Sequence, residues 1–92
     1  MELYYQFDQT MLDLKESPNG EDVEFTLQIF NDELKNRLTE IRKYFNTNKI
    51  LTDVHVYIHP NNRYQIIVRK DFRLEFILQL FKQQLVREIK WV

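Results

Sequence analysis

Two histidines and a tyrosine alternate along one short segment, a pattern that could bind a metal ion. His55, Tyr57 and His59 stand two residues apart, which in a β-strand places all three on the same face. At about 3.3 Å per residue the two histidines lie about 13 Å apart, whereas ligands of one zinc ion lie about 2.1 Å from it. Asp53 is nearer to His55, at about 7 Å along the strand, but the sequence supplies no third ligand. We therefore expect solvent-facing histidines, no metal site and no other cofactor.

The sequence has none of the motifs that usually mark an active site. It contains no nucleophile elbow, phosphate-binding loop, Gly-rich dinucleotide turn, HExxH motif or paired-carboxylate spacing. With one glycine and no cysteine, the chain cannot easily shape a loop around a phosphate, and it has neither disulfides nor thiolate ligands. We expect a protein that is not an enzyme and has no small-molecule substrate.

Basic and aromatic residues in the second half favour a different chemistry, the binding of single-stranded nucleic acid. Rings stack on unpaired bases and cations contact phosphates. The candidate contacts share or border one polar strand face and its turn: His55, Tyr57, Arg63, Arg69, Lys70 and Arg73. Only one of them is a clear stacking ring, and the isoelectric point near 6.1 is far from that of a dedicated binder. Nucleic-acid binding is therefore an alternative function.

Carboxylates crowd the first half of the chain and suggest a second alternative. Five of them surround one predicted hairpin: Asp13, Glu16, Glu21, Asp22 and Glu24. Such a surface could imitate nucleic acid and inhibit a protein with a basic groove, although acidic clusters are also common on solvated surfaces. Residues 1–35 carry nine acids and two bases, whereas residues 36–92 carry eleven bases and five acids, so the net charge of −1 conceals a strong polarity. We expect the two halves to neutralise each other within one fold.

A repeated pattern of elements should position these residues. Each half contains a Pro-Asn turn, an alternating apolar segment, an Asn or Asp cap and an amphipathic stretch. The pattern predicts two strand-turn-strand-helix units, residues 1–49 and 50–92, in a single domain. The predicted fold class is α+β in the order ββαββα, with a mostly antiparallel sheet and two helices on one face.

The strands of the first unit are predicted from alternation. Residues 3–16 read as one long strand in which the first apolar residues and the later pair, Leu12 and Leu14, occupy opposite faces. A bulge between Asp8 and Thr10 would restore the parity, and a short helix capped by Asp8 is the alternative. Pro18 and Gly20 then suit a turn with a bulge before the alternating strand 23–29.

The second hairpin has a predicted register. A three-residue loop, Pro60-Asn61-Asn62, places Asn62 in the left-handed conformation and puts six apolar residues on one face. Its pairs are Ile58 with Tyr64, Val56 with Ile66 and Val54 with Val68. Between the hairpins Asn31 should cap a helix that ends near residues 46–48. The buried stripe of that helix is Leu34, Leu38, Ile41 and Phe45.

The segment 72–89 reads as a final helix after an Asp71 cap, and it has two apolar stripes. At 100° per residue the larger stripe spans about 120° and is expected to face the sheet. It consists of Leu74, Ile77, Leu78, Phe81, Leu85, Ile89 and Val92. The second stripe lies nearly opposite and consists of Phe72, Phe76, Leu80 and Trp91. The second stripe needs a cover, either within the chain, from a second copy or from a foreign partner.

The second stripe carries the leading functional hypothesis, because an exposed apolar patch of that size is unusual on a monomer. We expect a non-enzymatic protein-interaction or regulatory module that forms a homodimer through Phe72, Phe76, Leu80 and Trp91. The chain begins without a signal peptide and has no apolar run of membrane-spanning length, so we expect a cytoplasmic protein with no membrane partner.

Overall fold

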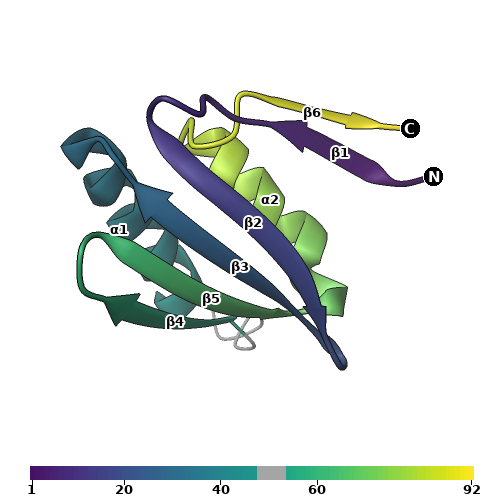
Figure 1. The fold of residues 1–92 in the computed structure, drawn as a ribbon. Coiled ribbons are helices and arrows are strands. Elements are labelled where there is room, and N and C mark those ends of the chain that lie inside the picture. The colour runs from purple at the N-terminus through teal and green to yellow at the C-terminus, as the bar shows by residue number, and fades with distance from the viewer. Residues whose placement is uncertain (48–53) are drawn as a thin grey trace.

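A four-stranded antiparallel sheet forms the centre of the molecule. The computed structural model describes residues 1–47 and 54–92. In spatial order the strands are β2 (Leu12–Asn19), β3 (Asp22–Ile29), β5 (Arg63–Arg69) and β4 (Val54–His59). Two helices, α1 (Asp32–Thr47) and α2 (Arg73–Lys82), lie on one face of this sheet (Figure 1). The predicted α+β class, the antiparallel sheet and the placement of both helices are confirmed, and the boundary between the units at 49–50 lies outside the described residues.

The first predicted strand is in fact two strands in different sheets. β1 (Leu3–Gln6) ends before Asp8, whose carboxylate accepts hydrogen bonds from the backbone N–H (2.9 Å) and the hydroxyl (2.6 Å) of Thr10. The backbone carbonyl of Asp8 accepts further bonds from the N–H groups of Met11 and Leu12. These bonds close a turn, because an aspartate side chain can satisfy the backbone two residues ahead. The predicted bulge and the alternative short helix are both wrong, although the chain does change direction where the parity slips.

The final helix is shorter than predicted, and its second half is not helical. A 3₁₀ turn, η1 (Lys70–Phe72), precedes α2, which ends at Lys82. Gln84 adopts φ 65°, and the N–H of Leu85 bonds to the carbonyl of Leu80, which is the Schellman arrangement that ends a helix. The chain then forms β6 (Glu88–Trp91), which pairs antiparallel with β1 as a separate two-stranded ribbon. Figure 1 shows this ribbon on the β2 side of the sheet, with both chain ends at its far end.

The second hairpin has its predicted register and loop, whereas the first hairpin matches its prediction only in part. The second has the predicted register and three-residue loop, with Asn61 and Asn62 at φ 64° and 60°. In the first, Asn19 pairs with Asp22, so the loop is Gly20-Glu21 and Pro18 lies within β2 rather than in the turn. Gly20 is left-handed as predicted, at φ 62°. Pro18 is tolerated because β2 is an edge strand, where a missing N–H leaves no neighbour unpaired.

The core lies between the four-stranded sheet and the two helices. The predicted stripe of α1 is buried, and the side chain of Asn31 caps this helix by accepting a bond from the N–H of Glu33 (2.8 Å). Phe76 of α2 packs between two aromatic rings, with centroid distances of 4.7 Å to Phe25 of β3 and 6.0 Å to Phe45 of α1. Among the described residues no polar or charged side chain is fully buried, and neither helix has the length and apolar run to cross a bilayer.

Substitutions at Phe76 and Leu78 should separate the buried face of α2 from its exposed face. We expect Phe76→Ala to lower the free energy of unfolding by about 3–5 kcal/mol, because it leaves a cavity between two rings. Leu78→Ala should cost less than about 1 kcal/mol, because this side chain is 41% exposed. Urea denaturation of both variants at low micromolar concentration measures the difference, and equal losses would contradict this orientation of α2.

Candidate functional site

The residues predicted to form an interface do not share a free surface. Phe76 and Leu80 are completely buried in the core, and Phe72 is half-buried against it. Only Trp91 is exposed, at 53%, and it belongs to β6 rather than to the helix. The prediction of an exposed stripe built from these four residues is therefore wrong. The prediction fails because the orientation of α2 about its own axis directs Phe76 toward the sheet and α1.

The opposite stripe, expected in the core, is divided: Ile77 and Leu85 are buried as predicted, whereas three of its residues on α2 are partly exposed. Leu74, Leu78 and Phe81 are 37%, 41% and 43% exposed, and their spacing of i, i+4 and i+7 places them on one face of the helix. We call these three residues the α2 stripe. Both stripes of this segment are apolar, so periodicity predicted an excess of apolar residues but could not tell which of them stay uncovered.

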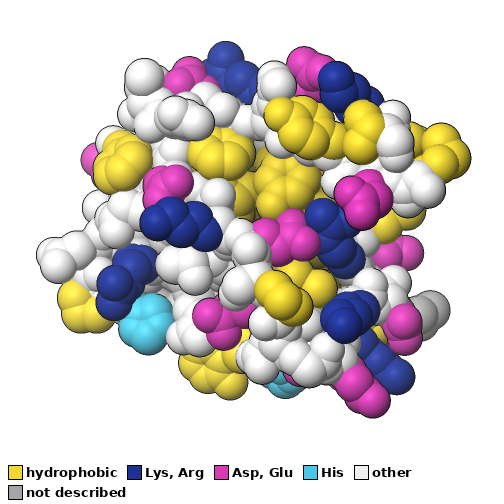
Figure 2. Space-filling model, turned by 45° about the vertical axis from the view of Figure 1, so that its right-hand side comes forward, with side chains coloured by type: hydrophobic (Ala, Val, Ile, Leu, Met, Phe, Trp, Pro, Cys, Tyr) yellow, Lys and Arg dark blue, Asp and Glu magenta, His cyan; other side chains and the backbone are white. Residues whose placement is uncertain are grey.

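Further apolar side chains are exposed on the β1–β6 ribbon. Tyr4 and Trp91 lie on its two strands, and Val92 follows β6. Figure 2 shows hydrophobic side chains gathered at the upper right of the molecule, where this ribbon lies. A two-stranded ribbon needs a packing partner to be stable. Here that partner is the core, because Leu3, Tyr5 and Ile89 pack against it.

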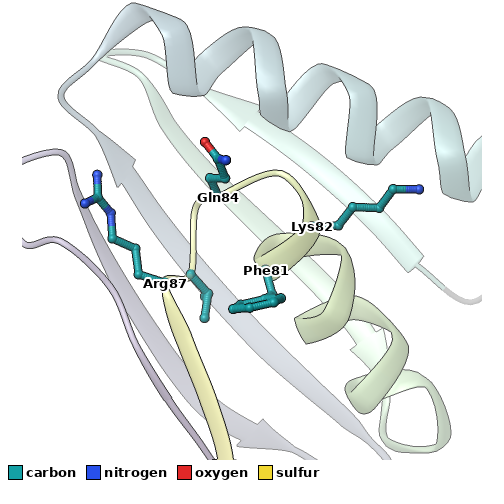
Figure 3. Close-up of a pocket in the computed structure, with 5 residues that line it drawn as sticks. Phe81, Lys82, Gln84 and Arg87 are labelled. Atoms are coloured by element: carbon teal, nitrogen blue, oxygen red, sulfur yellow. The ribbon is translucent and has the colours of Figure 1, made fainter.

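A hollow of about 570 Å³ lies beside the C-terminal end of α2. It is lined by Phe81, Lys82, Gln84, Val86 and Arg87. Figure 3 shows the polar side chains of Lys82, Gln84 and Arg87 pointing in different directions rather than toward one another. A small-molecule site needs polar groups that converge on the ligand. The polar side chains of this hollow do not converge in that way (Figure 3).

One polar cluster joins the ribbon, the sheet and α2. Arg73 donates from Nε to Oε2 of Glu16 (2.7 Å) and from Nη2 to Oε1 (3.1 Å), and the Tyr5 hydroxyl donates to the same Oε1 (2.7 Å). Both members of the ion pair are about a quarter exposed. The bond to Glu16 raises the pKa of Arg73, whereas burial and then the Glu16 carboxylate raise the pKa of Tyr5. The cluster positions elements and leaves Arg73 and Glu16 unavailable for other ligands.

The candidate nucleic-acid contacts are divided between different parts of the surface. The register places His55, Tyr57, Arg63 and Arg69 on the sheet face opposite the helices. Arg69 pairs with Asp71 (3.4 Å), Lys70 lies in η1 and Arg73 is held by Glu16. The same sheet face carries Glu24, which accepts a bond from Gln65 (3.1 Å), while Gln65 also contacts His59 (3.1 Å). The structure therefore places four of the six residues on one sheet face, with Arg63 and Arg69 at opposite ends of β5, among polar neighbours and an acid.

The acidic residues of the first hairpin also lie on different parts of the surface. Glu24 and Asp13 lie on the open face of the sheet, and Asp13 is 3.9 Å from the ammonium group of Lys15. Asp22 stands opposite Arg69 in the sheet, and Glu16 belongs to the cluster with Arg73. Of these contacts, the Glu16–Arg73 ion pair and the position of Asp22 opposite Arg69 join the acidic half to the basic half, whereas Asp13 and Lys15 both belong to the acidic half.

Metal ligands do not gather within residues 1–47 and 54–92, where no three His, Cys, Asp or Glu side chains could hold one ion. Asp53, considered above as a companion of His55, lies outside the described residues. Comparison with known proteins found no matching family model, no matching curated protein and no matching solved structure. Any functional assignment therefore depends on the surfaces described above.

The raised pKa of Tyr5 should appear in the pH dependence of stability. The folded chain keeps the phenol proton above the ordinary pKa of 10.0, whereas the unfolded chain loses it, so the free energy of unfolding should fall as the pH rises above about 10. Tyr5→Phe lacks this ionisation, and its stability should fall less steeply. Urea denaturation of both proteins between about pH 8 and 11 measures the two slopes. Parallel curves would show that Glu16 and burial do not hold this proton.

Proposed function

We propose that this domain is a non-enzymatic protein-interaction module of the cytoplasm that self-associates through the α2 stripe. The observation that carries the proposal is the exposure of Leu74, Leu78 and Phe81 on one face of a helix whose other face is completely buried. Apolar side chains in a continuous row gain free energy when a partner removes them from water, by about 25 cal/mol per Å². Dimers with two-fold symmetry are the commonest homo-oligomers of soluble proteins.

The charges beside the stripe favour a second copy as the partner. Glu75 and Lys82 are seven residues apart, which is nearly two helical turns, so they lie on the same flank of the stripe. Within the described part of the chain neither makes an ion pair, and one carboxylate oxygen of Glu75 is buried and has no hydrogen-bond partner.

An antiparallel packing of two α2 helices about a two-fold axis near Leu78 would use both features. It would bring the α2 stripes together and place Glu75 of each copy beside Lys82 of the other. The proposed interface is thus self-complementary in charge, as a symmetric dimer requires.

The two alternative functions have less support. For nucleic-acid binding, the six candidate residues are divided, and Arg73 and Arg69 already contact acids. For an acidic inhibitor, Glu16 and Asp13 are engaged with Arg73 and Lys15. No observation gathers either set into one free surface, so self-association remains the function that we propose.

A charge placed in the α2 stripe should separate the copies. We expect the wild type to sediment as a dimer at high micromolar concentration and Leu78→Glu to sediment as a folded monomer, because two like charges would meet near the two-fold axis. Phe30→Glu is the matched control: Phe30 is also apolar and 59% exposed but does not belong to α2, so its substitution should leave the dimer intact. Sedimentation equilibrium over a wide concentration range measures the mass.

Two outcomes of that experiment would refute the proposal. The first is a wild type that remains monomeric at the highest concentration tested. The second is an equal loss of association in Leu78→Glu and Phe30→Glu, which would indicate non-specific adhesion of apolar surface. Circular dichroism of both variants verifies that each is folded before the masses are compared.

A further inference from the structure

The two edges of the four-stranded sheet differ in how they are protected. The edge strand β2 carries two acids, a lysine and a proline, which are the residues that natural proteins use to discourage pairing with another strand: Asp13, Lys15, Glu16 and Pro18. The other edge strand, β4, has the sequence VHVYIH and contains no acid, lysine or proline. Within residues 1–47 and 54–92 its only strand neighbour is β5. Alternate backbone N–H and C=O groups of β4 therefore point away from the sheet and have no ladder partner among the described residues.

A hollow of about 220 Å³ lies between β4 and α1. From α1 it is lined by Arg42, Phe45 and Asn46, and from β4 by residues 54–57. Phe45 is buried and gives the hollow an apolar floor, whereas Arg42 and Asn46 form a polar wall. At the other end of β4, Ile58 is 58% exposed although it belongs to the helix-facing side of the strand. The free edge thus has apolar side chains beside it that nothing in the described chain covers.

Arg42 gives this hollow a positive charge that no acid among its described lining residues balances. Its side chain is half-buried and makes no ion pair or hydrogen bond with the described residues. None of the described residues that line the hollow is acidic, and His55 is a further basic group there. A guanidinium group in a partly desolvated place binds a carboxylate more strongly than one in open water, because the effective dielectric constant is lower.

We propose that β4 and Arg42 form a docking edge for an extended, acidic polypeptide segment. The segment adds as a further strand beside β4, and its main chain bonds to the free N–H and C=O groups of β4. Its alternate side chains lie over Phe45, Val54 and Val56, and one carboxylate on that face meets Arg42. This site is separate from the α2 stripe, so an occupied edge leaves self-association unchanged.

The charges beside β4 favour an acidic segment, rather than a second copy of β4, as the partner of this edge. Two copies of β4 paired about a two-fold axis would bring a second Arg42 and two more histidines to the seam, and neither β4 supplies an acid to meet them. Like charges across an interface disfavour a partner. The acidic segment supplies the missing carboxylate, and the second copy does not.

A synthetic peptide tests the proposal directly. The probe is a fluorescein-labelled nine-residue peptide, capped at both ends, with valine at odd positions, threonine at even positions and glutamate at position five. The matched peptide has lysine at position five. We expect fluorescence polarisation to show saturable binding of the glutamate peptide and at least tenfold weaker binding of the lysine peptide.

Variants and modified peptides distinguish strand addition from general attraction. Arg42→Ala should weaken the binding of the glutamate peptide at least tenfold. Arg37→Ala, on another flank of the same helix, should leave that binding unchanged. Two further peptides carry N-methyl groups on their odd or on their even residues. Only one set of amides can face β4, so one methylated peptide should lose binding and the other should keep it.

Three results would overturn the proposal. The proposal fails if the glutamate peptide does not bind the wild type at millimolar concentration, if the lysine peptide binds equally well, or if both methylated peptides bind like the parent. The comparison of peptides on the wild type is independent of any variant, so a misfolded Arg42→Ala does not leave the proposal untested. Sedimentation of the complex verifies that the oligomeric state is the same as that of the free protein.

Discussion

The antiparallel pairing of β3 with β5 is the contact on which the other features of this domain depend. It is the only strand pairing between the two hairpins, and it places Val23, Phe25 and Leu27 opposite Val68, Ile66 and Tyr64. Six helix-facing residues are thereby collected at the middle of the sheet, where Phe76 packs on Phe25. The same pairing brings Asp22 opposite Arg69 and Glu24 beside Gln65, so the acidic and basic halves meet along this seam. It also leaves β2 and β4 as the two edges.

The rotation of α2 follows from this arrangement and determines which surface is free. Phe76 points to the gap between Phe25 and Phe45, while Arg73 at the start of the helix is held by both oxygens of Glu16. Tyr5 adds a bond to the same carboxylate and ties the β1–β6 ribbon to the helix. With these contacts on one side, Leu74, Leu78 and Phe81 are left on the other. An apolar helix with two similar stripes thus has one defined exposed face, the one that we propose for self-association.

The sequence predicted correctly those elements that are determined by residues close to one another in the chain. The Asn31 cap and the four buried residues of α1 follow from a side-chain bond and a 3.6-residue period, and the second hairpin follows from two consecutive asparagines that tolerate positive φ. The break after Lys82 has no such signal, because glutamine rarely adopts the left-handed conformation that Gln84 has here. Beyond that break, Leu85 and Val86 are buried without being helical, and β6 pairs with a strand at the other end of the chain. The choice between the two stripes of α2 likewise depends on distant contacts, and so does the exposure of the β4 edge.

A single cysteine at the proposed two-fold axis gives the most direct test of the dimer. The chain has no cysteine of its own, so Leu78→Cys introduces the only thiol, and two such thiols near the axis can approach to the Cβ distance of about 3.5–4.5 Å that a disulfide requires. Tyr57→Cys introduces a thiol at the β4 edge, where the wild-type side chain is 51% exposed compared with 41% for Leu78. Under mild oxidation we expect Leu78→Cys to form a covalent dimer rapidly and nearly completely, and Tyr57→Cys to remain monomeric on a denaturing gel. Equal rates for the two variants, or a faster reaction at position 57, would contradict self-association through α2.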